Sequence, residues 1–215
     1  MRSRTATVIG SHTATGYELI KELCSRSVYD EVIVLSESKT PYSHEKMSER
    51  IIDFRYIEAG HLGVVDDVFC CVQPAKDDPW FDPLKLAAAV KKSNAAQYLV
   101  LSSMGADARS ALKLNRRYGE YELQLQKFIF PSLHIFRPSI LLTDPSEYRV
   151  KESAAEKVMT FAGWAMIGPL KTYKGIRASQ LALAMTEKAL NGECPSVAVY
   201  QSGEIENTKR SEIET

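Results

Sequence analysis

A glycine-bounded loop near the start of the chain is the first candidate for chemistry. Residues 8–16 read VIGSHTATG. Gly10 would allow a tight turn after an apolar run, and Gly16 would let the following helix approach the sheet. Backbone N–H groups of such a turn, together with the helix N-terminus, attract a pyrophosphate. The residues between the glycines that would contact this ligand are Ser11, His12, Thr13, Ala14 and Thr15.

The loop has a simpler alternative, a tight turn that binds nothing. Thr13 stands where a third glycine is expected. It lacks the freedom of glycine at positive φ, and its β-branched side chain takes up room near the phosphates. By itself this position predicts weaker binding rather than none.

An acidic residue follows the second predicted strand. Glu37 lies 21 residues after Gly16, and a carboxylate about 20 residues beyond such a loop hydrogen-bonds the ribose 2′-hydroxyl and repels a 2′-phosphate. The sequence therefore favours NAD over NADP slightly. Ser36, Ser38 and Lys39 beside it could instead accept a phosphate, and a solvated glutamate is the other alternative.

Alternating strands and helices position these residues. Apolar β-branched runs predict strands, and segments with apolar residues on one face predict helices between them. The predicted strands are 5–9, 31–35, 53–58, 66–72, 97–103, 133–142 and 196–200, and the predicted helices are 16–26, 84–94, 110–130, 150–166 and 176–191. Consecutive parallel strands need helical crossovers, so we predict an α/β fold with a doubly wound parallel sheet of the Rossmann type.

The domain prediction is a single Rossmann-type unit over residues 1–203. Within it, 138–175 could form a small lobe on the substrate side. The polar segment 204–215 is predicted to be a frayed tail, because it carries few apolar residues to pack.

Composition removes several classes of protein from consideration. Of the 215 residues, 45% are hydrophobic and 25% are charged, with 27 basic and 27 acidic side chains. This balance gives no field toward nucleic acid or an anionic membrane. No run approaches about 18 apolar residues, so no membrane span is predicted and the expected location is the cytoplasm. The cysteines and histidines lack ligand spacing, which predicts buried thiols and no metal site.

Four further segments, together with the loop, resemble the sequences of a known family. With the loop, DDVFCCV (66–72), YLVLSSMGADARS (98–110), RRYGEYE (116–122) and IFRPSILL (135–142) resemble the atypical short-chain dehydrogenase/reductase superfamily, in its Tat-interacting-protein-like oxidoreductase branch. The resemblance covers about residues 5–190. It implies a nicotinamide dinucleotide, NAD or NADP, across the sheet edge. The small-molecule substrate, which is not identified, would lie near the end of the fifth strand.

The resemblance also implies a proton relay that this chain lacks. The family uses a serine, matched by Ser103, and a Tyr-x-x-x-Lys pair on one helix face. Here the corresponding stretch reads LNRRYGE, with Leu114 at the tyrosine position and Tyr118 at the lysine position. Leucine transfers no proton. Tyr118 could still reach a substrate, although packing is its alternative role, as strand-end capping is for Ser103.

Two other positions bear on the cofactor side. The resemblance places Arg137 and Pro138 beside the nicotinamide, with a structural ion pair as the alternative for the arginine. At Gln73-Pro74 family members have glycine, and proline offers no N–H.

The sequence thus predicts an NAD(P)-binding oxidoreductase-family protein with impaired or unusual catalysis, and whether it turns over stays open. The alternatives are a dinucleotide sensor without turnover and an interaction scaffold that binds no dinucleotide. A homo-oligomer or a protein partner also stays open.

Overall fold

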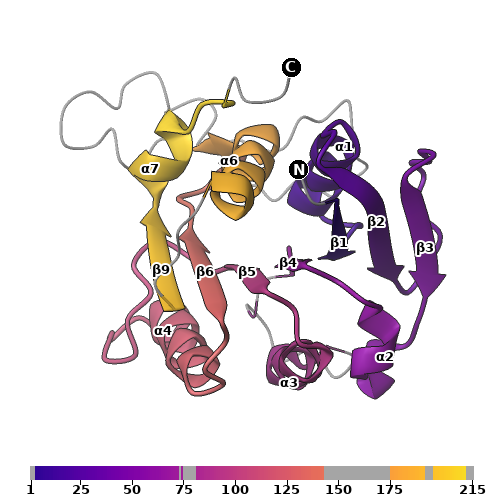
Figure 1. Cartoon of the computed structure of the whole chain (residues 1–215). Coiled ribbons are helices and arrows are strands. Elements are labelled where there is room, and N and C mark those ends of the chain that lie inside the picture. The colour runs from indigo at the N-terminus through magenta and orange to yellow at the C-terminus, as the bar shows by residue number, and fades with distance from the viewer. Residues whose placement is uncertain (1–2, 73, 75–80, 143–174, 192–195, 212–215) are drawn as a thin grey trace.

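A single parallel sheet forms the centre of the molecule. The computed structural model describes residues 3–72, 74, 81–142, 175–191 and 196–211. Its seven-stranded sheet has the order β3-β2-β1-β4-β5-β6-β9, and every neighbouring pair is parallel (Figure 1). The strands are β1 (Arg4–Ile9), β2 (Tyr29–Ser36), β3 (Met47–Ile51), β4 (Asp67–Cys70), β5 (Gln97–Leu101), β6 (Ser132–Arg137) and β9 (Ser196–Gln201). The order reverses between β1 and β4, so the predicted doubly wound Rossmann-type fold is confirmed.

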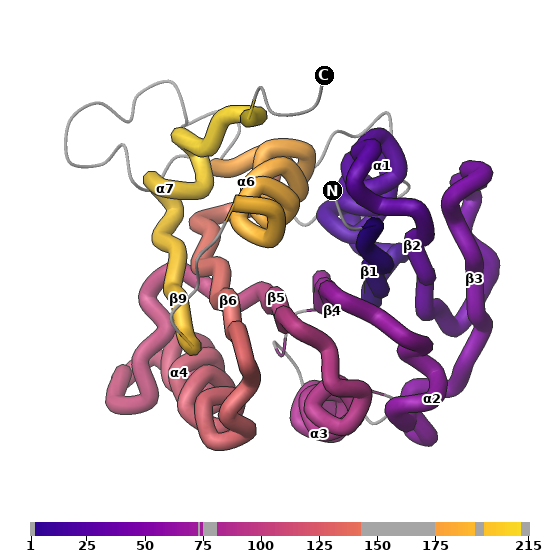
Figure 2. The backbone as a smooth tube through the Cα atoms, in the orientation of Figure 1, coloured from indigo at the N-terminus to yellow at the C-terminus, as the bar shows by residue number. Residues whose placement is uncertain are grey.

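Helices cover both faces of this sheet (Figure 2). One face carries α1 (Ala14–Cys24) and α6 (Ala178–Asn191), which pack against each other. The other carries α2 (Ala59–Leu62), α3 (Pro83–Ser93) and α4 (Lys113–Gln126). Each face has its own buried apolar cluster. In α1 the side chains of Leu19, Ile20 and Leu23 are buried, as the helical spacing predicts.

The third strand lies earlier than predicted. Residues 53–58 are not a strand: Asp53 accepts a hydrogen bond from the N–H of Arg55 and begins the short 3-10 helix η1 (Phe54–Tyr56). The strand is β3, whose sequence MSERI pairs with β2. As the edge strand of the sheet it is largely half-buried, so its hydrophobic signal is weak.

The predicted frayed tail is wrong for residues 204–211. After β9 the chain forms α7 (Ser202–Asn207), in which Ile205 is 1% exposed. Gln180 on α6 donates to the carbonyl oxygens of Ile205 and Thr208, at 2.9 and 2.8 Å. Polar residues of this segment therefore find partners on neighbouring helices, which a reading of hydropathy alone does not detect.

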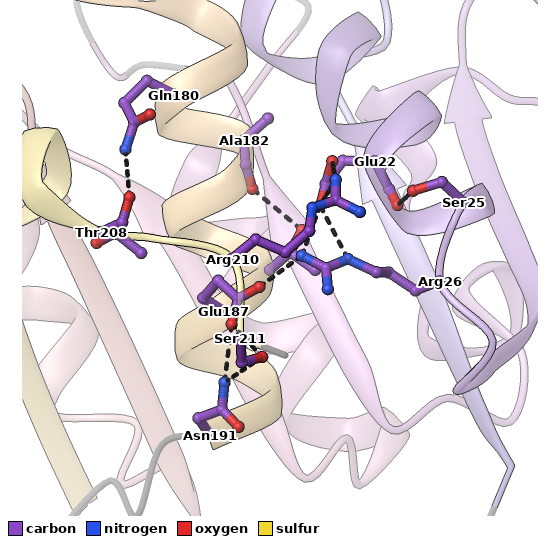
Figure 3. A network of polar contacts seen from close by, with 11 residues as sticks. Glu22, Ser25, Arg26, Gln180, Ala182, Glu187, Asn191, Thr208, Arg210 and Ser211 are labelled. Carbon is purple, nitrogen blue, oxygen red and sulfur yellow. Dashed lines mark hydrogen bonds and ion pairs between the residues drawn. The ribbon is translucent and has the colours of Figure 1, made fainter. Parts of the chain in front are cut away.

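A buried ionic network joins α1, α6 and the segment after α7 (Figure 3). Arg26 has no exposed side-chain surface, and its Nη2 lies 2.7 Å from Glu22 and 2.5 Å from Glu187. Arg210 then pairs with Glu22 at 2.6 Å, and Ser211 donates to Glu187 at 2.7 Å. The network fixes α1, and hence the loop at its start, against α6.

The predicted lobe at 138–175 and the predicted buried cysteines are described only in part. Of the region 138–175, the structure describes a parallel pair, β7 (Leu141–Leu142) and β8 (Ile176–Arg177), while residues 143–174, including the predicted helix at 150–166, lie outside the described residues. Cys24, Cys70 and Cys71 are buried free thiols, as predicted, and Cys194 lies outside the described residues. 

Within the described ranges, no helix has the length and apolar character to cross a membrane, and no group of three or more metal-ligating side chains is found. The cytoplasmic location stays a prediction.

The interior holds one histidine whose ionisation opposes folding. His134 on β6 is fully buried and makes hydrogen bonds of 2.9 Å with Ser132 and with the hydroxyl of Tyr200. Burial lowers its pKa from 6.5 to about 4, with a smaller contribution from the charge of Lys188. The native state therefore holds the neutral imidazole at pH values where the unfolded chain is protonated.

We predict that this histidine makes the fold acid-sensitive. Its contribution is complete above pH 6.5 and is lost as the pH falls toward 4, about 2.5 kcal/mol by pH 4.5. Asp67 changes stability in the opposite direction, because burial raises its pKa to about 6. The measurement is therefore the difference in urea-unfolding free energy between pH 7 and 4.5, compared for wild type and His134→Gln. Equal pH dependence in both proteins would contradict the prediction.

Candidate functional site

The loop after β1 lies at the carboxyl edge of the sheet, beside the reversal in strand order where ligands of such folds bind. Gly10 follows β1 with a φ of +93°. A Cβ on Gly10 would lie 2.9 Å from Val72 Cγ2 and 3.2 Å from Val72 N. Glycine is thus required here for two reasons, the left-handed backbone and the close approach to the chain leaving β4.

The start of α1 packs directly on this loop. A Cβ on Gly16 would lie 2.0 Å from the carbonyl oxygen of Gly10, a distance that no side chain allows. The same carbonyl accepts hydrogen bonds from the N–H and the hydroxyl of Thr13, at 2.9 and 2.8 Å. The second glycine therefore permits close contact between helix and loop, as predicted.

Thr13 is the N-cap residue of α1. Its φ and ψ are −87° and 153°, and its Oγ1 accepts from the N–H of Gly16 at 3.0 Å. The expectation that this position needs glycine at positive φ is wrong, because the backbone is extended and threonine is a favoured capping residue. The threonine is a structural solution rather than a missing glycine.

Two backbone donors remain at this helix end. Within the described part of the chain, the N–H groups of Ala14 and Thr15 make no hydrogen bond, as expected for the first turn of a helix. They lie at the positive end of the helix dipole. Ser11 is buried, with its Oγ 3.2 Å from the hydroxyl of Thr40, and His12 is exposed. This arrangement fits a pyrophosphate.

Glu37 lies within electrostatic range of Arg55, a cation that sequence reasoning missed. It is exposed, immediately after β2. Its charge contributes to the raised pKa of the Arg55 guanidinium, although the hydrogen bond from Arg55 to Asp53 is the main cause. Arg55 lies in the 3-10 helix after β3. Because a strand was predicted at 53–58, the sequence did not indicate that Arg55 lies near Glu37.

The two serines after β5 have different surroundings. Ser102 is fully buried and donates its hydroxyl to Glu122 at 2.5 Å. Ser103, the predicted catalytic serine, is half-buried, and its hydroxyl makes no hydrogen bond with the described residues. The structure thus leaves the hydroxyl of Ser103 available at the strand end.

Arg137 forms an ion pair within the protein. Its Nε and Nη2 donate to the two carboxylate oxygens of Glu122, at 2.9 and 2.5 Å. Glu122 is 3% exposed. The observed contacts of Arg137 are those of a structural ion pair, the alternative to a place beside the nicotinamide. The carbonyl oxygen of buried Pro138 accepts from the N–H of Met104 at 2.9 Å, joining the ends of β5 and β6.

An open depression of about 530 Å³ lies beside this ion pair, between α4 and the loop after β5. Its lining residues are Ala106, Asp107, Ala108, Arg109, Gly119, Glu122, Leu123, Gln126 and Arg137.

Tyr118 does not have the properties of a proton donor. It is 2% exposed, and burial raises its pKa to about 12, against a smaller opposing effect of Arg117. The predicted catalytic role needs an accessible phenol with a lowered pKa, so the packing alternative describes this residue better. Leu114, one turn earlier, is 50% exposed. At Gly119 a Cβ would lie 2.1 Å from the N of Ala108, which explains the glycine of this motif.

The segment after β4 is only partly described. Pro74 is buried, and Gln73 lies outside the described residues. The expectation that proline deprives the cofactor of an N–H stays a prediction.

Comparison with models of known protein families gives no match. Among curated proteins, Protein HTATIP2 from Rattus norvegicus is 26% identical over 175 residues, which cover 73% of this chain and 71% of that protein. The similarity to HTATIP2 thus extends over about three quarters of the chain. This confirms the resemblance carried by the motifs.

Two further proteins are similar to the chain. "Protein fmp52-1, mitochondrial" from Aspergillus terreus is 30% identical over 116 residues, and the match spans 53% of this chain and half of that relative. The solved structure "MoeE5 in complex with UDP-glucuronic acid and NAD" has a TM-score of 0.65 and 13% identity, covering 91% of this chain and 75% of that one. The structural likeness shows the Rossmann-like fold.

We predict that Thr13 stabilises the fold through its cap. Thr13→Ala removes hydrogen bonds to Gly16 and Gly10 and is expected to cost about 1 kcal/mol, lowering the melting temperature by about 2–4 °C. Thr13→Ser keeps the cap and is the control. Thr13→Gly is expected to cost only a few tenths of a kcal/mol and to leave dinucleotide binding no tighter. Tighter NADH binding by Thr13→Gly would show that the position does need glycine.

Proposed function

We propose that the chain binds NAD or NADP at the carboxyl edge of the sheet and passes hydride to a small acceptor without a Tyr-Lys proton relay. The observation that carries the proposal is the construction of the loop between Gly10 and Gly16, which holds the first turn of α1 against the end of β4 with two N–H groups unused. A bound nicotinamide would supply the hydride. The NAD named with MoeE5, a protein of the same fold, supports this ligand class.

The loop would hold the pyrophosphate. Gly10 lets the backbone turn, and the N–H groups of Ala14 and Thr15 face the phosphate oxygens. Thr13 and Gly16 keep the helix end in place through the cap. Ser11 and His12 complete the loop, Ser11 through its contact with Thr40. Arg137 and Pro138 contribute by fixing the ends of β5 and β6 rather than by a free charge.

The preference between the two dinucleotides follows from charge. The exposed carboxylate of Glu37 would accept a hydrogen bond from the ribose 2′-hydroxyl of NAD and would repel the 2′-phosphate of NADP. Arg55 nearby reduces this repulsion. We therefore expect a small preference for NAD.

The acceptor follows from the residues on the substrate side. Ser103 offers a hydroxyl to hold a substrate oxygen, Leu114 offers no proton, and Tyr118 keeps its proton inside the protein. Carbonyl reduction needs a proton delivered to the developing alkoxide. Quinone-like and flavin-like acceptors take hydride and can then gain protons from water, so they suit this site better.

A second candidate is a dinucleotide sensor without turnover. The burial of Tyr118 and the apolar Leu114 favour it, because both changes remove chemistry and leave the loop intact. The sensor and the enzyme share the same binding step and differ only in turnover.

Binding is tested by titrating NADH and NADPH and following nicotinamide fluorescence and melting temperature. We predict that Ala14→Glu weakens NADH binding at least tenfold relative to Ala14→Gln, because its carboxylate would face the pyrophosphate. A carboxylate in the first turn favours the helix itself, so the folded state is kept. Equal binding by the two variants would place the pyrophosphate elsewhere. If the wild type bound neither dinucleotide at millimolar concentration, the proposal would fail and the scaffold alternative would remain.

Turnover is tested by NADH oxidation with panels of quinones, flavins and aldehydes. We predict oxidation with quinones or flavins, little or none with aldehydes, and a lower rate in Ser103→Ala with an unchanged NADH dissociation constant. Ser110→Ala, at a half-buried serine away from the strand end whose hydroxyl accepts a hydrogen bond from the N–H of Leu112, is the control. Absence of oxidation with every acceptor in a protein that binds NADH would favour the sensor.

A further inference from the structure

Polar contacts hold the end of the described chain against α1 and α6 (Figure 3). Within the described residues, Ile205 is the last buried side chain, and residues 206–211 are half-buried or exposed. The carbonyl oxygen of Thr208 accepts a hydrogen bond of 2.8 Å from the side-chain amide of Gln180. A segment with so little buried apolar surface detaches at a low cost in free energy. Residues 208–211 thus form a detachable clasp.

The charges around the clasp balance. Arg26 has no exposed side-chain surface, and its Nη2 lies 2.7 Å from Glu22 and 2.5 Å from Glu187. Arg210, in the clasp, donates from Nη2 to both carboxylate oxygens of Glu22, at 2.8 and 2.6 Å. Two carboxylates therefore face two guanidinium groups, and each guanidinium already contacts a carboxylate. An added negative charge would leave this cluster of four side chains with an excess of negative charge.

The hydroxyl of Ser211 lies against one of these carboxylates. It donates to Glu187 Oε2 at 2.7 Å, and Asn191 donates to the same oxygen at 2.9 Å. Burial opposes the charge of Glu187, but hydrogen bonds from Ser211 and Arg26 outweigh it and lower the pKa of the carboxyl below its usual value. Glu187 is therefore an anion at neutral pH. A negative group on the Ser211 oxygen would face it directly.

We propose that Ser211 is a phosphorylation site and that phosphorylation releases the clasp from α1 and α6. A protein kinase would transfer the γ-phosphoryl group of a nucleoside triphosphate. The serine Oγ–P bond forms, the bond to the diphosphate breaks, and the hydroxyl proton passes to the kinase or to water. Ser211 then has no proton to donate to Glu187, and its phosphate carries a charge of about −1.5 to −2 at pH 7. The lost hydrogen bond and the added charge both favour release.

The sequence around Ser211 suits this modification. Glu212 and Glu214 follow it, and acid-directed protein kinases bind carboxylates that follow a serine through their own Arg and Lys side chains. Because the hydroxyl is half-buried, the kinase would act on the detached clasp, and the phosphate would then prevent its return. The release needs no dinucleotide and is independent of the proposed function.

Ser211→Asp and Ser211→Asn test the charge, because the two side chains have nearly the same shape and only the first is ionised. Hydrogen exchange followed by mass spectrometry reports on α7, which the clasp adjoins. We expect the amides of α7 to exchange about tenfold faster in Ser211→Asp than in Ser211→Asn, and faster still with phosphoserine incorporated at position 211. The amides of α3, on the other face of the sheet, are the internal control and are expected to be unchanged.

The same comparison in a Glu187→Gln background identifies the opposing charge. There the difference between the Asp and Asn variants is expected to fall to about twofold or less, since glutamine is neutral. If Glu187→Gln does not fold, 1 M salt, with a Debye length of about 3 Å, provides the same comparison.

Equal exchange in Ser211→Asp and Ser211→Asn would overturn the inference. So would exchange that is faster in α3 as well as α7, because it would show a general loss of stability rather than release. Phosphopeptide mapping of the protein recovered from the cells that make it is expected to show phosphoserine at position 211. A Ser211 that stays unmodified there in every growth condition would overturn the assignment of the site.

Discussion

The contact between the first turn of α1 and the carbonyl of Gly10 is the constraint on which the candidate site depends. A Cβ on Gly16 would lie 2.0 Å from that oxygen, so the helix can approach only because this residue is glycine. Thr13 bonds to the same carbonyl and to the N–H of Gly16. The helix end is thereby held at the strand end with its unused N–H groups at the edge of the sheet. The buried Arg26 network holds the rest of α1 against α6, so the loop is supported from both sides.

A second constraint fixes the substrate side. Glu122 on α4 binds Arg137 through two hydrogen bonds and accepts a third from Ser102. One buried carboxylate thus joins the ends of β5 and β6 to the helix that carries Tyr118. Its partners satisfy both carboxylate oxygens, which offsets the cost of burying the charge. Ser103, the next residue after Ser102, is left without such a bond and can serve a ligand.

Strongly patterned features could be predicted from the sequence. The buried strands gave continuous apolar runs, so the fold followed from their alternation with helices, and both glycines of the loop lie where the spacing predicts. The edge strand β3 could not be found this way, because half-buried MSERI has almost no hydrophobic pattern. The role of Thr13 was also missed. The sequence pattern indicates only where a glycine with positive φ is expected. The role of Thr13 as a capping residue depends on its hydrogen bond with Gly16, which forms only in the folded helix.

The positions at which this chain differs from the family pattern therefore do not form one group. Thr13 keeps the helix end intact and lies on the side of the candidate site that we propose binds the dinucleotide, where the glycines and the free donors also lie. Leu114 and Tyr118 stand at the two positions that the family resemblance assigns to proton transfer, where one side chain has no proton to give and the other is buried with a pKa of about 12. Phosphate binding depends on backbone donors and a helix end, whereas proton transfer depends on individual side chains. Substitution can thus remove the second without disturbing the first, and this separation is what makes a dinucleotide-binding protein with altered chemistry physically consistent.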